Sequence, residues 1–320
     1  MKLINFHKDI ISHFKRSDIS IFHDFVPPPT GGGHQFLRAL QRYLTEINYS
    51  IENNSISPNT RACVFNSFNF DFNRLKRLRK KRPECLMLHR VDGPISTYRG
   101  FDDGTDKSIE TINQELADLT IFQSNYSIKA HLQLGMTLKE PHILIQNTPD
   151  PLLFNPLNRE KFRHSRKTRI ISTSWSDNPN KGLETYRWLD ANLNWTRYEY
   201  LFIGRIKTDF QNIRHIPPVD PTKLANYLRE SDIFITASLH DPCSNSLLES
   251  LACGLPVLYV NSGGHGELVK DAGLSFTDPS EIPALLEQMI NRYSTFQRLI
   301  NIPTLDHVAH QYLRAMNILD

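Results

Sequence analysis

The stretch DPCSNSLLESLACGLPVLYVNSGGHGELV, from Asp241 to Val269, contains the most informative pattern in this sequence. Two carboxylates, Asp241 and Glu249, stand eight positions apart, and a helix-like run lies between and around them. A small-residue turn, the strand-like run 257–260 and a Gly-Gly turn follow. A strand after a helix is the repeating unit of a parallel α/β sheet. The stretch therefore predicts two acids beside the start of a helix, facing a glycine-rich loop at one edge of such a sheet.

The same alternation extends through the rest of the chain. The predicted strands are 18–26, 61–68, 85–91, 119–123, 142–146, 169–174, 200–203, one near 215, 233–237 and 257–260. The predicted helices begin at 34 and cover 69–82, 107–117, 126–134, 181–193, 221–230, 281–291 and part of 307–319. Such alternation indicates right-handed βαβ units and the α/β fold class, with helices on both faces of parallel sheets.

One segment interrupts the alternation and indicates two domains. Residues 148–167 are rich in proline and then basic, which is typical of a linker. We therefore expect an N-terminal, acceptor-side domain over 1–150 and a C-terminal, ligand-binding domain over 151–295. We expect the last helix, in 296–320, to pack back on the N-terminal domain. Two doubly wound domains bind their ligand in the cleft between them, at the carboxyl ends of the strands.

The composition is that of an ordinary globular chain and excludes several classes of protein. Hydrophobic residues make up 39% of the 320 residues and the net charge is only +3, which gives no case for nucleic-acid binding. Charges interrupt the apolar residues of 1–18, so we expect no signal peptide, and no apolar run predicts a membrane span. The four cysteines form no C-x-x-C pair, so we expect no zinc site and a reducing, cytoplasmic setting.

The stretch that begins at Asp241 resembles the donor-site signature of retaining GT-B glycosyltransferases of family 4. That signature is an acid, seven residues and a glutamate, followed by small residues and Cys-Gly-Leu-Pro. The segment SWSDNPNKG (174–182) and the turn GGHGELV (263–269) extend the resemblance over roughly 167–291, in wording similar to a bacterial polysaccharide-type branch, group 1. The resemblance implies the GT-B fold, with two Rossmann-like domains and a nucleotide-sugar in the interdomain cleft.

The resemblance also gives roles to the residues of this stretch. Glu249 matches the acid that holds the ribose hydroxyls, and Asp241 matches the acid that meets the sugar hydroxyls, where the family uses the longer Glu. A carboxylate accepts two hydrogen bonds from adjacent hydroxyls. The amides of Ser244, Asn245 and Ser246 lie at the predicted helix start, where they favour phosphate oxygens. A purely structural interpretation also exists, because Ser246 and Glu249 have the S-x-x-E spacing of a capping box.

Lys181 is the candidate cation for the diphosphate. It follows a predicted buried strand and matches the lysine of the family pattern G-R-x(n)-K-G. An ammonium there stabilises the charge that grows on the leaving phosphate. Trp175 or its neighbour stands in the place of the family arginine. Either Lys181 and the helix amides suffice, or another cation serves, for which Arg205 in the run FIGR is the candidate.

Two N-terminal segments are expected on the other side of the cleft. The run PPPTGGGHQFL (27–37) places glycines between a strand and a helix, where the backbone of Gly32 and Gly33 can approach a donor closely. A plain strand–helix turn is the alternative, and the run lacks the G-x-G-x-x-G spacing of dinucleotide sites. The run CLMLHRVDGP (85–94) places Asp92 where the family commonly has a histidine, so we expect Asp92 to touch the sugar or the acceptor.

The segment NRLKRLRKKR (73–82) has seven cations in ten residues beside an apolar stripe. Two interpretations remain open for this predicted helix. It is a core stripe with a solvated basic face, or it lies on an anionic membrane surface, where a peripheral enzyme with a lipid-linked acceptor would work. RNA binding is disfavoured because no aromatic residues alternate with the charges.

Together these features predict a metal-independent glycosyltransferase with Asp92, Asp241 and Lys181 at its catalytic centre. It would move a sugar, with retention, from a nucleotide-diphosphate-sugar to a glycan or glycolipid acceptor, and it would need no cofactor beyond that co-substrate. The alternative is a catalytically inactive sugar-nucleotide-binding protein that acts as a sensor or partner subunit, because Trp175 and the short Asp241 depart from the family. A GT-B epimerase or phosphorylase is a third possibility. The side chains leave open the base, the sugar, the acceptor and the oligomeric state.

Overall fold

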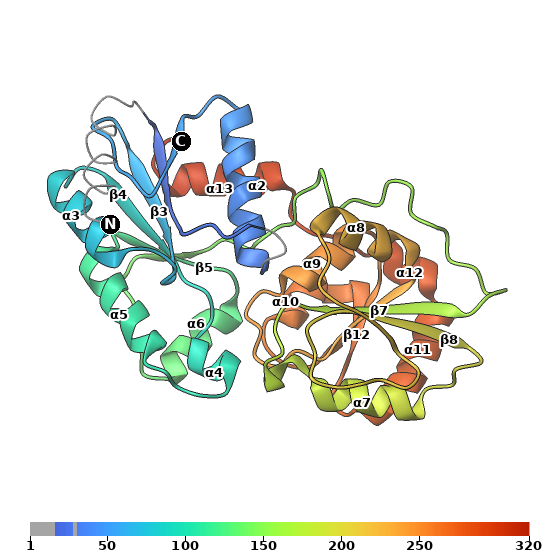
Figure 1. Cartoon of the computed structure of the whole chain (residues 1–320). Helices are drawn as coiled ribbons and strands as arrows, with labels where there is room; N and C mark the ends of the chain where they lie inside the picture. The colour runs from blue at the N-terminus through green and yellow to red at the C-terminus, as the bar shows by residue number, and fades with distance from the viewer. Residues whose placement is uncertain (1–16, 28–30, 320) are drawn as a thin grey trace.

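The computed structural model describes residues 17–27 and 31–319. The prediction that 1–18 form no signal peptide falls almost entirely outside these ranges. Figure 1 shows two α/β domains side by side, between which the chain passes twice. Each domain is built on a six-stranded sheet whose neighbouring strands run parallel. The predicted α/β architecture with two parallel sheets is confirmed.

The N-terminal sheet has the strand order β2-β1-β3-β4-β5-β6. Its strands are β1 Ile19–Phe22, β2 Ile51–Asn53, β3 Ala62–Asn66, β4 Leu86–Arg90, β5 Leu119–Phe122 and β6 His142–Leu144. The C-terminal sheet has the order β12-β11-β10-β7-β8-β9. Its strands are β7 Thr168–Ser174, β8 Tyr198–Gly204, β9 Arg214–Ile216, β10 Ile233–Thr236, β11 Val257–Val260 and β12 Gly273–Phe276. In both sheets the order reverses beside the first strand of the domain, and such switch points form ligand crevices at the carboxyl ends of the strands.

Helices cover both faces of each sheet (Figure 1). The helices of the N-terminal half are α2 Gly32–Glu46, α3 Phe72–Lys81, α4 Ile95–Arg99, α5 Thr105–Leu116 and α6 Asn125–Gln133. Those of the C-terminal half are α7 Leu183–Asn192, α8 Pro221–Glu230, α9 Asn245–Ala252, α10 His265–Val269, α11 Ile282–Asn291, α12 Tyr293–Arg298 and α13 Leu305–Ala315. The short 3-10 helices are η1 Pro179–Lys181, η2 Lys270–Ala272 and η3 Pro279–Glu281.

Apolar spacing explains how these helices attach to the sheets. In α2, Phe36, Leu37, Leu40 and Leu44 recur every three or four residues and are buried, as the period of a one-sided helix requires. They form one core with β1, β3 and β4 and with the far C-terminal helix α13, whose Tyr312 is fully buried. The last helix of the chain therefore packs on the N-terminal domain, next to α2.

Local signals set the beginning of α8, which was predicted over the residues that it occupies. The Asp220 carboxylate caps the helix by accepting hydrogen bonds from the backbone amides of Thr222 and Lys223. Pro221 occupies the first helical position, where its missing N–H and fixed φ do no harm. Among the described residues, five strands and α-helices were not predicted, namely β2, α4, α10, β12 and α12, and neither were the three 3-10 helices. They have three to six residues each, which is too short for a periodic pattern to identify.

Candidate functional site

The largest set of predicted site residues meets in a cavity of about 440 Å³ between the two domains, at the carboxyl ends of the strands. Residues of both domains line it. The N-terminal domain supplies His23, Gly31, Gly32, Gly33, His34, Asn66, Asn69, Asp92, Gly93, Ile95, Tyr98 and Arg99. The C-terminal domain supplies Thr173, Ser174, Trp175, Ser176, Lys181, Tyr186, Thr236, Ser238, Asp241, Pro242, Cys243, Ser244, Asn245 and Ser246. A cavity of this size at two switch points is the expected place for a nucleotide-sugar.

Lys181 and Asp241 form an ion pair on the C-terminal wall of this cavity. The Lys181 Nζ lies 3.0 Å from the Asp241 carboxylate and donates a second hydrogen bond of 3.0 Å to the Ser238 hydroxyl. The ring of Tyr98, from α4 of the other domain, lies 4.5 Å from the same ammonium. The cation at this wall is therefore shared between a carboxylate, a hydroxyl and an aromatic ring that belong to two domains.

Charge pairing fixes the protonation of both groups. Burial works against the charge of Lys181, but the Asp241 carboxylate and Tyr98 outweigh it and raise the lysine pKa. Burial likewise works to raise the pKa of Asp241, but the Lys181 ammonium outweighs it and the pKa falls below its ordinary value. Both groups are therefore charged at neutral pH, as a phosphate-binding cation and a hydroxyl-binding carboxylate require.

The amino end of α9 lies at the wall of the cavity beside this pair. Ser244 is the N-cap residue, and α9 begins at Asn245. The cavity is lined by Ser244, Asn245 and Ser246, so the predicted helix start and its amides lie where they were expected. The capping-box interpretation is wrong, because Ser246 lies inside the helix and its hydroxyl contacts Ser244 at 3.1 Å.

Glu249 lies one helical turn further along α9 and does not line the cavity. Its residue is 3% exposed, and its Oε2 atom has no hydrogen-bond partner among the described residues. Burial raises the pKa of this carboxyl to about 8. An unpartnered buried carboxylate is costly for folding. A ligand that donates a hydrogen bond to Glu249 would therefore offset this cost and stabilise the folded protein.

The glycine-rich loop meets the C-terminal domain directly. A Cβ atom on Gly32 would lie 2.2 Å from the Cβ of Asn245, so only glycine allows the two domains to approach this closely at α9. A Cβ on Gly33 would meet no other described atom within 4 Å. Of the two glycines predicted to bind the donor, Gly32 is thus required by the interdomain contact and Gly33 is not under that constraint.

Asp92 faces the cavity from the end of β4. Its carboxylate accepts a hydrogen bond of 2.9 Å from the fully buried Arg90 and one of 3.1 Å from the Ser67 hydroxyl. Arg90 in turn donates to Asn147, in the first passage between the domains. The side chain of Asp92 remains 38% exposed, so part of its surface is open to a ligand.

A histidine pair on the same wall was not predicted. His23, just after β1, has its Nε2 at 2.8 Å from Nδ1 of His34, in the first turn of α2. Burial, with His34 and Arg90 nearby, lowers the pKa of His23 to about 4, and burial with Arg38 lowers that of His34. Both imidazoles are therefore neutral at pH 7 and can each donate or accept a hydrogen bond. The only available signal was that each histidine adjoins a strand end or the glycine loop.

Arg205, proposed as a substitute for the family arginine, does not line the cavity. Its exposed guanidinium donates a hydrogen bond of 2.8 Å to the carbonyl of Trp175, the residue expected at the place of the family arginine. Trp175 itself lines the cavity and packs on a core cluster. The contact ties the loop after β8 to the loop after β7, and the Arg205 guanidinium is not part of the cavity lining.

The basic helix α3 uses its apolar stripe in the protein core. Leu75 and Leu78 are buried, and Phe72 packs against the same cluster. Lys76 and Arg79 pair with carboxylates of α5 and the loop after it. The cations of α3 that are exposed, here called the exposed α3 cations, are Arg77, Lys80 and Lys81. No apolar face is left to enter a membrane, which favours the interpretation as a core stripe with a solvated face.

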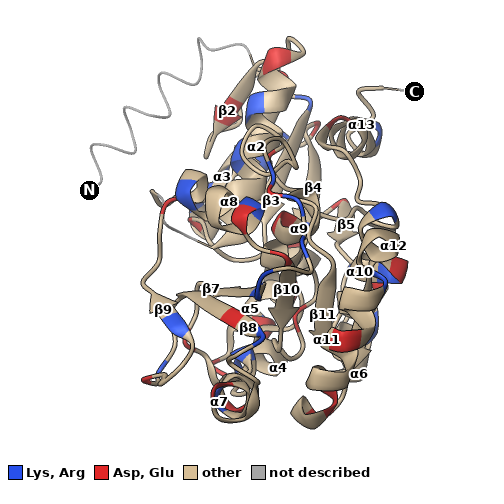
Figure 2. Cartoon of the chain, turned by 90° about the vertical axis from the view of Figure 1, so that its right-hand side faces the viewer, with Lys and Arg blue, Asp and Glu red and all other residues tan. Residues whose placement is uncertain are grey.

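Charges elsewhere show no strong segregation. Figure 2 shows acidic and basic segments interspersed along the visible chain. Within 17–27 and 31–319, no helix is long and apolar enough to cross a membrane. Over the same ranges, no three or more His, Cys, Asp or Glu side chains are grouped so that they could hold a metal ion.

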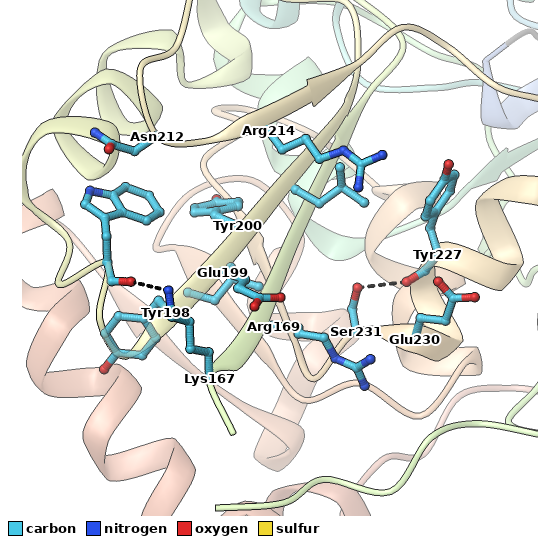
Figure 3. Close-up of a pocket in the computed structure, with 13 residues that line it drawn as sticks. Lys167, Arg169, Tyr198, Glu199, Tyr200, Asn212, Arg214, Tyr227, Glu230 and Ser231 are labelled. Carbon is cyan, nitrogen blue, oxygen red and sulfur yellow. Dashed lines mark hydrogen bonds between the residues drawn. The ribbon is translucent and has the colours of Figure 1, made fainter. Parts of the chain in front are cut away.

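A second hollow of about 480 Å³ lies in the C-terminal domain, away from the domain cleft (Figure 3). It is formed at the amino ends of β7 and β8, by residues such as Arg169, Tyr200 and Arg214, and by the end of α8. Two of the polar groups drawn there bond to the protein itself: Lys167 donates to the carbonyl of Trp195, and Ser231 donates to that of Tyr227. Ligands of doubly wound sheets bind at the carboxyl ends, so the interdomain cavity is the better candidate despite its similar size.

Comparison with known proteins gives a family match for part of the chain. Residues 198–294, from β8 into α12, match the family described as Glycosyl transferases group 1. No curated protein sequence matches the chain. Among solved structures, sucrose-phosphate synthase from Thermosynechococcus elongatus superposes with a TM-score of 0.69 at 15% identity, over 94% of this chain and 98% of that one.

Two further structures were solved with nucleotides. HepE from Anabaena, in complex with UDP and glucose, has a TM-score of 0.71 at 14% identity and covers 95% of this chain and 100% of its own. The catalytic domain of starch synthase IV from Arabidopsis thaliana, bound to ADP and acarbose, has a TM-score of 0.68 at 10% identity, with coverages of 95% and 99%. These likenesses over the whole chain show that the protein has the GT-B fold, as predicted, with a region of the group 1 glycosyltransferase type in its C-terminal domain.

Proposed function

We propose that the protein is a retaining glycosyltransferase that transfers a sugar from a nucleotide-diphosphate-sugar to a glycan or glycolipid acceptor. The observation that supports this most directly is the Lys181–Asp241 pair beside the amino end of α9, inside the interdomain cavity. A cation, free helix amides and a carboxylate are the groups that a diphosphate and a sugar polyol need, and here they converge within one site.

In the proposed reaction each group has one task. The Lys181 ammonium and the α9 amides bind the diphosphate and stabilise its charge as the bond from the anomeric carbon to the phosphate oxygen breaks. The acceptor oxygen forms its bond to the anomeric carbon on the same face, and its proton passes to the leaving phosphate. Asp241 and Asp92 hold sugar and acceptor hydroxyls from opposite walls. Glu249 accepts hydrogen bonds from the ribose hydroxyls once the nucleotide reaches α9. No metal or further cofactor enters this scheme, and we propose a cytoplasmic site of action, peripheral to a membrane if the acceptor is lipid-linked.

A thermal-shift screen against UDP, GDP, ADP and dTDP tests the donor site. A ligand at a hundredfold excess over its Kd stabilises the folded state by about 2.7 kcal/mol, which is readily measured. The best nucleotide then selects the sugar donors for a transfer assay, in which NMR of the product gives the anomeric configuration. Stabilisation by none of the four nucleotides would contradict the proposal, and an inverted product would contradict retention.

A second candidate function is that of a catalytically inactive sugar-nucleotide-binding protein. It is favoured by Trp175 at the expected place of the family arginine, and by Arg205 bonding to the Trp175 carbonyl without lining the cavity. Both candidates predict nucleotide binding in the thermal-shift screen, so the transfer assay and a donor-hydrolysis assay separate them. Nucleotide binding without hydrolysis or transfer of any tested donor, across a broad acceptor panel, would favour the inactive protein.

A further inference from the structure

Glu267, which was not among the predicted site residues, joins the two domains through hydrogen bonds to its carboxylate. It lies in α10 of the C-terminal domain, and its carboxylate receives the amino end of α6 in the N-terminal domain. Oε2 accepts hydrogen bonds of 2.8 Å and 3.0 Å from the backbone and side-chain nitrogens of Asn125, and Oε1 accepts one of 2.8 Å from the backbone of Tyr126. A carboxylate on free helix amides combines charge-assisted hydrogen bonds with the favourable end of the helix dipole.

On the N-terminal side this contact leads directly to Asp92. The first turn of α6 also contains Ser127, whose hydroxyl donates a hydrogen bond of 3.2 Å to the Asp92 carbonyl. Ser127 is fully buried, and its amide is capped by the Ser124 hydroxyl at 3.0 Å. The part of α6 that Glu267 holds is therefore the part that supports the backbone of Asp92.

On the C-terminal side the contact leads equally directly to Asp241. The residues just before α10 are Gly263 and Gly264, and the Gly264 amide donates a hydrogen bond of 2.9 Å to the Asp241 carbonyl. Gly263 has φ +65°, and a Cβ there would lie 2.3 Å from the same carbonyl oxygen. This glycine pair packs so closely on Asp241 that a shift of α10 must move the backbone of Asp241 too.

The neighbours of the two acids also touch each other. A Cβ on Gly93, next to Asp92, would lie 2.9 Å from the ring of Pro242, next to Asp241. The backbones carrying the acids are thus in contact on one side and are linked through α6, Glu267 and the glycine pair on the other. Figure 1 shows α6 on the side of its domain that faces α10.

We infer that Glu267 is a positioning residue that fixes the separation of Asp92 and Asp241 across the cavity. The inference rests on the proposed function, in which both acids hold reacting partners. A displacement of about 1 Å between reacting groups lowers a rate by as much as about a hundredfold. A carboxylate outside the cavity therefore controls the rate of transfer without touching either substrate.

The test compares Glu267→Gln with the wild type and with Glu281→Gln as a matched control. Glu281 is an exposed carboxylate that accepts backbone hydrogen bonds within one domain, from Asp278 and Thr277, so its loss does not affect the domain junction. The glutamine at 267 has nearly the same shape but loses the charge and turns an N–H group toward donors. Hydrogen exchange, kcat, KM and the Kd for UDP and ADP are measured for all three proteins.

We expect the amides of 125–128 and of 91–93 to exchange at least tenfold faster in Glu267→Gln. We expect kcat to fall about ten- to hundredfold while the nucleotide Kd changes less than threefold, with Glu281→Gln like the wild type. Unchanged exchange, or faster exchange at 125–128 with kcat within twofold, would overturn the inference. If the wild type transfers no sugar, the proposed function fails, and the exchange at 91–93 still decides whether Glu267 positions the backbone of Asp92.

Discussion

The buried carboxyl of Glu249 makes the stability of this protein depend on pH in a defined direction. Its pKa is about 8 in the folded protein, against about 4.3 for an unfolded chain. Because the folded state binds the proton more tightly, the carboxyl causes no penalty below pH 4. Between about pH 4 and pH 8 the loss of unfolding free energy grows as pH rises, and above pH 8 it levels off.

The magnitude follows from the two pKa values. Because the unfolded chain ionises Glu249 at lower pH than the folded protein does, this carboxyl lowers the unfolding free energy by about 1 kcal/mol at pH 5 and by about 5 kcal/mol at pH 9. Glu249→Gln removes this ionisation but keeps the shape of the side chain. The difference in unfolding free energy between Glu249→Gln and the wild type should therefore rise by about 4 kcal/mol, in favour of the variant, from pH 5 to pH 9.

Denaturant unfolding without ligand, at half-unit steps of pH, measures this difference. If the difference in unfolding free energy between Glu249→Gln and the wild type stayed constant from pH 5 to pH 9, the reasoning would be refuted. Such a result would show that the Glu249 carboxylate is solvated or paired. Nucleotide binding offers an independent check. Ribose hydroxyls bind the ionised form of Glu249, so nucleotide binding by the wild type should tighten as pH rises to about 8 and should release a proton. Calorimetry in two buffers detects this proton release. Glu249→Gln should show neither effect.

Three further predictions follow from the cavity and the charged helix. In Asp241→Asn the affinity for a nucleoside diphosphate should survive, while turnover should fall about 10- to 1000-fold in a steady-state assay; an unchanged kcat would remove Asp241 from the site. Gly32→Ala places a methyl group against Asn245, so it should lower kcat by up to about a hundredfold and enlarge the radius of gyration in solution scattering. Gly33→Ala should lower kcat less, and equal effects of the two substitutions would contradict the steric argument. If the exposed α3 cations bind anionic lipid, their replacement by Ser should weaken binding to anionic vesicles by up to about 3 kcal/mol at low salt; a wild type without preference for anionic vesicles would confirm the solvated face that the structure favours.

The sequence predicted the sheets well because buried parallel strands are continuous apolar runs. All five residues of β3 are buried, and the run stands out from the polar residues around it. The short elements have no such signal. β2 pairs with only three residues of β1, and α10 makes little more than one turn, so their formation depends on the neighbours and not on a local pattern.

For the site, spacing along the chain identified residues but not their surroundings. Asp241, Lys181 and Asp92 line one cavity as expected, because strand ends of a parallel sheet share an edge. The burial of Glu249 depends on what packs around α9, which no spacing reveals. The glycine-rich loop was identified by its composition, but the reason for Gly32 is a residue in the other domain.

The placement of α13 has a consequence for how the protein is made. Its buried Tyr312 and Leu313 complete the core that α2 begins, yet a ribosome synthesises them after the whole C-terminal domain. At about 5–20 residues per second, the roughly 160 residues between β6 and α13 take about 8 to 32 seconds. During this time α2 packs on its sheet but lacks its partner helix, so the apolar side chains that α13 will cover are open to chaperones. The domain that leaves the ribosome first is therefore the one that finishes folding last.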